Sequence, residues 1–80
     1  MNSPDSSILK RVGARLRELR ARAGISQEEL AARASLHRTY VGGIERGERN
    51  VAVLNLVRLA VALEVEPSEL LVGSNWETPQ

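Results

Sequence analysis

The 80-residue chain has no cysteine and a single histidine. Disulfide bonds and a cysteine-ligated zinc ion are therefore excluded as sources of stability, and one histidine makes no metal site. No apolar run approaches the roughly 20 residues that cross a bilayer, and the start MNSPDSSILKR lacks the hydrophobic segment of a signal peptide. We therefore expect a cytoplasmic protein that binds neither a metal nor a membrane.

Recognisable catalytic arrangements are also missing. The sequence contains no pair of acidic residues suited to acid–base chemistry, no nucleophile placed beside a base and no glycine-rich phosphate loop. We therefore expect no enzyme activity, no cofactor and no small-molecule ligand.

The short length limits the architecture to one domain. A chain of this size buries only about 60% of its unfolded surface, so its stability is modest unless it oligomerises. We expect a disordered leader over residues 1–5, a folded domain over 6–72 and a flexible tail over 73–80. The sequence assigns no place to Trp76 in this tail.

The net charge of +1 conceals an uneven distribution. Residues 1–50 hold ten Lys or Arg against six Asp or Glu, a balance of +4, whereas residues 51–80 hold one against four, a balance of −3. Ten of the eleven cations are arginine, which favours bidentate contacts with phosphate or guanine. The basic half therefore indicates a surface for a polyanion, although a solvated helix surface explains the charge equally well.

Apolar residues spaced three and four positions apart predict a first helix from about Ser6 to Gly24, where glycine ends it. Arg20 follows Leu16 by four positions, so it points near the core and needs a partner. The apolar face of this helix consists of Ile8, Val12, Leu16, Leu19 and Ala23.

The segment SQEELAARA has the start signal of a second helix, predicted over 26–34. Ser26 stands at the N-cap and Glu29 three residues later, which is the spacing of a capping box. Ile25, just before the cap, is placed to pack against Leu30 as a hydrophobic staple. The buried face of this helix is Leu30, Ala31 and Ala34.

A third short helix is predicted over 37–45, with Val41 and Ile44 buried. Its interior holds two adjacent glycines, Gly42 and Gly43. Each glycine in a helix interior costs roughly 1 kcal/mol relative to alanine. Two of them in so small a protein require a structural or functional reason.

A fourth helix over 53–63 is apolar around more than half of its circumference, whereas a surface helix has a stripe a little over 100° wide. Leu54 and Val61 provide the surplus, which indicates either a homodimer interface or a fully central position in the bundle. The arc expected to face the core is Val53, Leu56, Val57, Leu59, Ala60 and Leu63. The residues expected to break the apolar surface are Asn55, Arg58 and Ala62.

The segment EPSELL predicts a last short helix with Pro67 at its first position, so the fold class is all-α with five helices. The helices over 26–34 and 37–45 are joined by a tight turn at 35–36. Two short helices connected in this way form a helix-turn-helix unit, whose second helix can enter the major groove of DNA.

Four hydrogen-bond donors open the second helix of this unit: His37, Arg38, Thr39 and Tyr40. Because the apolar residues of the helix face inward, Arg38 and Thr39 are expected to face outward. An arginine can donate two hydrogen bonds to guanine, and a threonine methyl group can contact thymine.

The run ISQEELAARASLHRTYVGGIERGERNVAVLNLVRLAVALEVEPSELL resembles the Cro/repressor-type (XRE-like) helix-turn-helix family. More narrowly, LHRTYVGGIERGERN is similar to the controller proteins of restriction–modification systems. The resemblance covers about residues 8–71. It implies a compact, five-helix, lambda-repressor-like domain in the bacterial cytoplasm, associated with the nucleoid. It also implies a homodimer that binds double-stranded DNA at an operator with paired half-sites.

The resemblance implies roles for individual residues. Base edges would be read by Arg38, Thr39 and Tyr40. Contacts with the DNA backbone would come from Gln27, His37, Arg46, Arg49 and Asn50. Arg20 and Glu45 match a buried ion pair that orients the recognition helix more than it adds net stability. From the wide apolar arc of the fourth helix, the dimer interface is assigned to Leu54, Val57 and Val61.

Three positions depart from the family pattern. Ser35 stands where glycine is common, so we expect a left-handed conformation there. His37 stands where Ser or Thr usually caps the recognition helix, and imidazole is a poorer cap. Gly43 stands where several phage repressors carry a base-reading side chain, so base reading should concentrate in HRTY. Small residues here would set how closely the backbone meets the duplex, unless Gly42 packs against another helix.

Other interpretations stay open. The chain could be a phage-type repressor or an antitoxin-like regulator of the same family, or a protein-interaction module without DNA binding. Arg46 and Arg49 could be solvated loop charges, and Tyr40 could be a core aromatic. RNA polymerase is a further candidate partner for an acidic patch at Glu28 and Glu29, although the capping box already explains the second of these.

Overall fold

The computed structural model describes residues 4–73, which contain four α-helices, one 3-10 helix and no β-strand. The elements are α1 (Pro4–Ala23), α2 (Gln27–Ala34), α3 (Arg38–Glu45), α4 (Val53–Leu63) and η1 (Pro67–Leu71). The expected leader residues 1–3 and tail residues 74–80, with Trp76, lie outside the described part. No helix within the described part is both long enough and apolar enough to span a membrane.

The expectation of five α-helices was wrong for the last element. The segment Pro67–Leu71 is a single 3-10 helix of five residues. Such short pieces favour the tighter helix. In addition, the backbone carbonyl of Glu69 accepts a hydrogen bond from Arg15 Nε at 2.8 Å. This side chain of α1 therefore satisfies a carbonyl that would bond to a backbone N–H in a longer helix.

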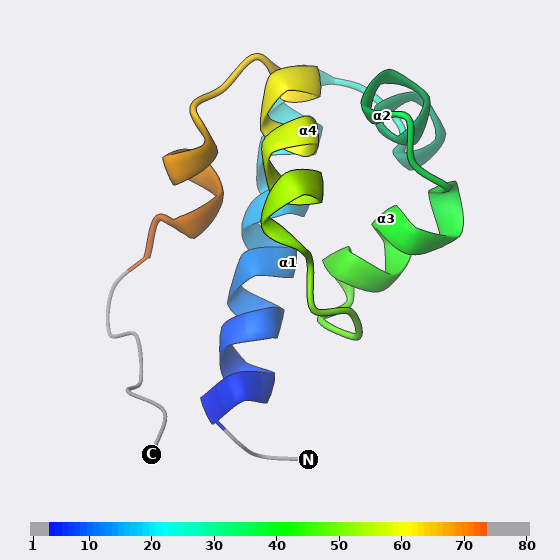
Figure 1. Ribbon diagram of the computed structural model, residues 1–80. Coiled ribbons are helices and arrows are strands. Elements are labelled where there is room, and N and C mark those ends of the chain that lie inside the picture. The colour runs from blue at the N-terminus through cyan, green and yellow to red at the C-terminus, as the bar shows by residue number, and fades with distance from the viewer. Residues whose placement is uncertain (1–3, 74–80) are drawn as a thin grey trace.

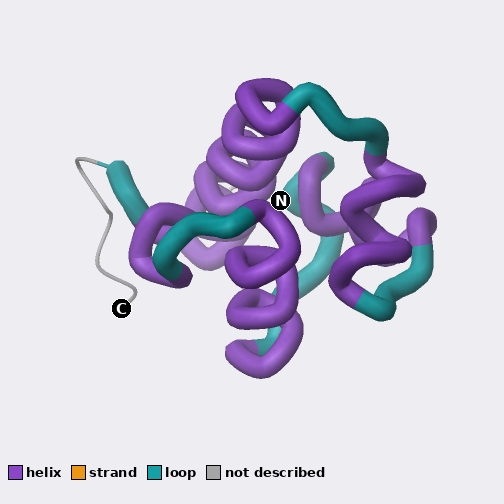
Figure 2. The backbone as a smooth tube through the Cα atoms, turned by 90° about the horizontal axis from the view of Figure 1, so that it is seen from above, coloured by secondary structure: helices purple, strands orange, loops and turns teal. Residues whose placement is uncertain are grey.

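Two long helices form the centre of the molecule, and the shorter elements lie on either side of them. In Figure 1 α4 lies in front of α1, with η1 on one flank of the two helices and the α2–α3 pair on the other. The view from above in Figure 2 shows the same separation of η1 from α2 and α3. In this arrangement α3 packs on α1 and α2, while α2 also packs on α4. Helix α3 is therefore held from two directions.

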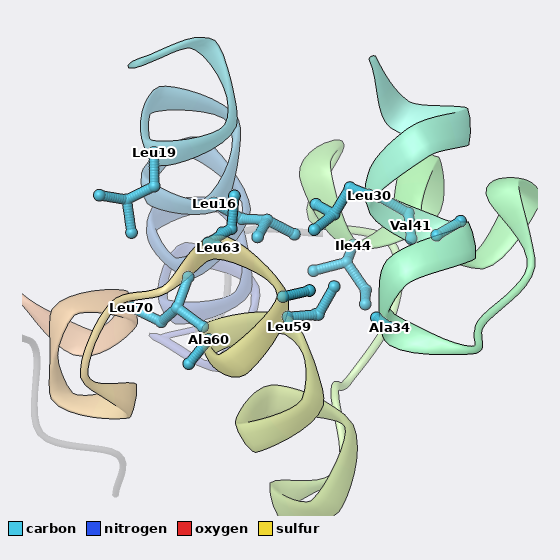
Figure 3. Close-up of a cluster of buried hydrophobic side chains, with 12 residues drawn as sticks. Leu16, Leu19, Leu30, Ala34, Val41, Ile44, Leu59, Ala60, Leu63 and Leu70 are labelled. Atoms are coloured by element: carbon cyan, nitrogen blue, oxygen red, sulfur yellow. The ribbon is translucent and has the colours of Figure 1, made fainter. Parts of the chain in front are cut away.

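An aliphatic core fills the space between these elements, and every helix contributes to it (Figure 3). Burial of each such side chain contributes roughly 1.5–3 kcal/mol relative to exposure. The largest fully buried side chains are Leu16, Leu30, Val41, Ile44, Leu59 and Leu70. The predicted inner faces of the second and third helices are thus confirmed.

Helix α1 begins earlier and packs differently at its end than the pattern predicted. It starts at Pro4 rather than Ser6, because proline suits the first helical position and Asp5 in the first turn faces the positive end of the helix dipole. Ala23 was assigned to the apolar face but is exposed, since the last turn of α1 extends beyond the core. Gly13, which the pattern did not single out, is buried.

Four chain reversals follow the same left-handed geometry. Gly24, Ser35, Gly47 and Glu64 have φ values of 72°, 58°, 76° and 59°. At each site the following N–H bonds back to a carbonyl of the last helical turn, as in the Schellman motif. The left-handed conformation predicted for Ser35 is confirmed. Glu64 adopts it as well, which the sequence did not indicate.

Helix α4 is rotated relative to the prediction. Ala62 was expected to face outward but is buried, together with Leu59, Ala60 and Leu63. Val53 and Val57 were expected in the core arc, yet they are 78% and 38% exposed. Because the four buried residues lie together on one side of the helix, Val53 and Val57 fall on the other side and face solvent. The apolar surplus is thus an exposed face made of Val53, Leu54, Val57 and Val61, here called the α4 face.

Candidate nucleic-acid interface

The helix-turn-helix unit begins with half of the expected capping box. The backbone N–H of Glu29 donates to Ser26 Oγ at 3.0 Å, so the N-cap bond is present. The carboxylate of Glu29 instead pairs with Arg33 one turn later. Leu30 is fully buried, and Ile25 packs against the same core, as the staple predicted.

The first turn of α3 presents its polar side chains to solvent. His37 occupies the N-cap without a side-chain hydrogen bond to the helix, so it leaves the cap unfilled. Arg38 and Thr39 are exposed. They border a polar hollow of about 220 Å³ whose lining residues are Gln27, Arg38, Thr39, Gly42 and Arg46. Four residues that were assigned to DNA contact therefore meet at one place on the surface: Gln27, Arg38, Thr39 and Arg46.

An exposed carboxylate accompanies the arginine at this site. Arg38 Nε lies 3.6 Å from Glu28 Oε1, with the two side chains 65% and 75% exposed. This distance is too long for a hydrogen bond but allows electrostatic attraction. The sequence pattern did not reveal this pair, because it depends on how α2 and α3 cross.

Tyr40 is turned partly inward. Its ring is half-buried against the hydrophobic core, and its hydroxyl accepts a hydrogen bond from Asn55 Nδ2 at 3.1 Å. The residue thus connects α3 with α4, as the core-aromatic alternative suggested. Its predicted role in reading bases stays a prediction.

A buried ion pair ties α3 to α1. Arg20 Nε and Nη2 donate to Glu45 Oε2 and Oε1 at 2.6 and 3.0 Å. Arg20 Nη1 also donates to the Ile25 carbonyl at 3.0 Å. The Glu45 side chain is only 3% exposed, so the partner that Arg20 required is fully inside the domain.

Gln27 extends this pair to the surface. Its Nε2 donates to Glu45 Oε1 at 2.9 Å. Burial raises the pKa of Glu45, but the hydrogen bonds from Arg20 and Gln27 and the nearby positive charges outweigh it, so the pKa is lowered overall. Because the amide nitrogen carries two hydrogens, Gln27 is held by one and can direct the other towards a ligand.

The loop after α3 carries three residues that were assigned to DNA backbone contact. Arg46 Nε pairs with Glu48 Oε1 at 3.1 Å, and both side chains are more than half exposed. Arg49 is exposed, and its aliphatic stem lies across Gly43. Asn50 lies apart from the polar hollow, beside residues of the first turns of α1.

Comparisons with known proteins agree with this geometry. A sequence profile described as helix-turn-helix matches residues 16–70. The control protein C.BamHI of Bacillus amyloliquefaciens is 45% identical over 60 residues, which is 74% of each chain. A crystal structure of the restriction-modification controller protein C.AhdI from Aeromonas hydrophila aligns with a TM-score of 0.77 and 56% identity, over 78% of this chain and 94% of that one.

A hypothetical transcription factor, NHTF, from Neisseria aligns with a TM-score of 0.80 at 36% identity, over 88% of this chain and 79% of that one. The chain belongs to the helix-turn-helix family. Within this family it is similar to the restriction–modification control proteins named above, as well as to this transcription factor.

Proposed function

We propose that this protein is a sequence-specific DNA-binding regulator of transcription, rather than an enzyme, and that α3 is its recognition helix. The observation that carries the proposal is the exposed first turn of α3. There Arg38 and Thr39 border a polar hollow together with Gln27 and Arg46. Side chains at the start of a recognition helix are the ones that reach base edges in the major groove.

The contacts divide into those that read sequence and those that position the protein. Arg38 would donate to a guanine, and the Thr39 methyl would contact a thymine. Tyr40, fixed by Asn55, would lie against the DNA at the inner edge of the helix. Phosphates would be bound by residues around the helix: Gln27, His37, Arg46, Arg49 and Asn50. Phosphate contacts fix orientation but carry no sequence information.

Dimerisation through the α4 face completes the proposed binding unit. Leu54 and Val61 are 62% and 69% exposed, and together with Val53 and Val57 they form an apolar patch of the kind that marks interaction sites. Val57 and Val61 also line a hollow of about 280 Å³ beside the end of α2, into which side chains of a second copy could insert. Two α3 helices about one helical turn apart, roughly 34 Å, would bind a palindromic operator.

The similarity to control proteins supports a role in a restriction–modification system. In such a circuit the number of dimers on the operators decides between activation and repression, and RNA polymerase is a candidate partner. The similarity to the Neisseria transcription factor favours a second candidate, a regulator of another circuit. Restriction and methyltransferase genes beside the coding sequence distinguish the first from the second.

DNA binding is tested by selecting duplexes from a random pool and measuring the affinity of the recovered duplex against salt. Arg46 and Arg49 of both protomers would neutralise four phosphates, so the slope of log K against log salt should be roughly −4. Absence of salt-sensitive binding would contradict the proposal and favour a protein-interaction module.

A further inference from the structure

The two glycines in the interior of α3 are covered by side chains of the following loop. A Cβ atom built on Gly43 would lie 2.8 Å from Arg49 Cγ and 3.4 Å from its Nε. A Cβ atom on Gly42 would lie 3.1 Å from Arg46 Nη1 and 3.5 Å from Gln27 Oε1. Both glycines are buried, and the atoms nearest to them belong to side chains that were assigned to DNA contact: Arg46 and Gln27 at Gly42, and Arg49 at Gly43.

The turn that ends α3 brings Arg49 back over Gly43. Gly47 N–H donates to the Ile44 carbonyl at 2.9 Å, and Glu48 N–H donates to the Gly43 carbonyl at 2.8 Å. Gly47 has the left-handed φ of 76° that this reversal requires. As a result the loop runs along α3, and the same glycine provides both a carbonyl for the turn and free space for a side chain.

We propose that Gly43 is a positioning residue for Arg49, and that Arg49 in this seat binds a phosphate of the DNA half-site. The proposal rests on the DNA-binding function proposed above. The missing side chain of Gly43 leaves room for the methylene stem of Arg49 along the helix, while the guanidinium reaches the exposed edge of the interface. A stem that is already ordered loses less conformational freedom when the guanidinium binds an anion.

The two glycines differ in how far the neighbouring side chain would have to move if the glycine were replaced by alanine. The atom nearest to a methyl group at Gly42 is the terminal nitrogen of Arg46, which can move by a few tenths of an ångström at little cost. The atom nearest to a methyl group at Gly43 is Arg49 Cγ, in the middle of the stem, so the whole side chain must leave. Alanine should therefore disturb DNA binding more at 43 than at 42.

Gly43→Ala separates this role from a structural one, because alanine is a far better helix former than glycine. We expect the variant to unfold at an equal or higher urea concentration than the parent, yet to bind the selected duplex about three- to tenfold more weakly. Arg49→Ala should weaken binding by a similar factor. Both changes should reduce the salt slope by roughly 2 for a dimer.

The double variant Gly43→Ala with Arg49→Ala should bind no more weakly than Arg49→Ala alone. Gly42→Ala, which meets only the guanidinium of Arg46 and the end of Gln27, should weaken binding less than Gly43→Ala does. Independent, multiplying effects of the two single changes would overturn the proposal. So would parental affinity of Gly43→Ala, or its unfolding at lower urea, because only Arg49 should have to move. A parent protein without salt-sensitive binding would instead reject the proposed function itself.

Discussion

Arginines on the proposed DNA side of the molecule already face carboxylates in the free protein. Arg38 and Arg46 are placed beside Glu28 and Glu48, and all four side chains are more than half exposed. Exposed ion pairs of this kind contribute little to stability, so a base edge or a phosphate can displace the carboxylate readily. If these arginines contact DNA as proposed, the same carboxylates would repel phosphates wherever no specific contact compensates, and this repulsion would limit binding to random DNA.

Arg38→Ala should weaken binding to the selected duplex by about 1–3 kcal/mol, because a bidentate contact with guanine is lost. Binding to random DNA should change much less. Arg22→Ala is the matched control, since Arg22 is an exposed arginine of α1 that pairs with Glu18. Fluorescence anisotropy on both duplexes measures the two affinities. Equal losses on selected and random DNA would refute a base-reading role for Arg38.

Ser35→Gly should stabilise the protein by about 1 kcal/mol, since a side chain in the left-handed region costs that much and glycine avoids it. The midpoint of urea unfolding measures the gain. The same substitution within α1, Ser7→Gly, should lower stability by about 0.5–1 kcal/mol. A loss of stability at position 35 would show that the serine side chain compensates for its strained backbone.

Some of these residue-level features were accessible from the sequence. Ser35 stands where the family it resembles often has glycine, which predicted its left-handed conformation. His37 stands where that family has Ser or Thr, which predicted a poorer cap, and the structure shows no side-chain cap hydrogen bond there. The packing of the Arg49 side chain on Gly43 could not be predicted, because it depends on the path of the loop after α3. For the same reason the two explanations considered from the sequence, close approach of the backbone to DNA and packing of Gly42 on another helix, did not include this contact.

Hydrogen bonds among three polar side chains connect helices α1, α2 and α3. Glu45 on α3 is bound by Arg20 from α1 and by Gln27 at the start of α2. Three helices therefore meet at a single buried carboxylate. Such a pair fixes the relative orientation of the helices more than it adds net stability, whereas removing one partner leaves the other charge unpaired in the interior.

Glu45→Gln should destabilise the domain by about 3 kcal/mol at neutral pH, because Arg20 loses its counter-charge in a buried position. Since the folded-state pKa of Glu45 is lowered, its stabilising contribution is present above the unfolded-state pKa of about 4.3 and is lost as the pH falls through the folded value. Urea unfolding between about pH 3 and 7 should therefore show a steeper acid loss in the parent than in Glu45→Gln.

Glu18→Gln provides the control for this pH experiment. Hydrogen bonds and charge from Arg15 and Arg22 also lower the pKa of Glu18, but its side chain is 47% exposed. Its removal should cost far less than that of Glu45. If both variants lost the same stability, the buried position of Glu45 would have no special effect.

The helices themselves were largely predictable, while their rotations were not. Capping residues, glycines and apolar spacing indicate where α2, α3 and α4 lie along the chain. The wheel for α4 placed Val53 and Val57 inside and Ala62 outside, because an apolar arc of more than half the circumference does not define its own orientation. The packing of α2, η1 and α1 against α4 decides which part of the arc is covered.

At the scale of the whole molecule, the residues that the structure describes leave the α4 face uncovered. If this face forms the dimer interface, Leu54→Glu should convert the protein to a monomer at micromolar concentration, because a charge would be buried without a partner. Sedimentation equilibrium gives the mass. Leu71→Glu is the matched control, since Leu71 is 50% exposed but belongs to η1. An unchanged dimer in Leu54→Glu, or a monomeric parent, would place the interface elsewhere or remove it.

The contact between α1 and the end of α3 has a consequence for how new binding preferences could arise. A Cβ atom on Gly13 would lie 2.2 Å from the Ile44 carbonyl oxygen, so here two helix backbones touch directly. The far end of α3 is therefore located by main chain and by the ion pair, whereas Arg38 and Thr39 at its near end support none of the core. If Arg38 and Thr39 read bases as proposed, other side chains can replace them without repacking the domain, and one scaffold would then acquire new target sequences.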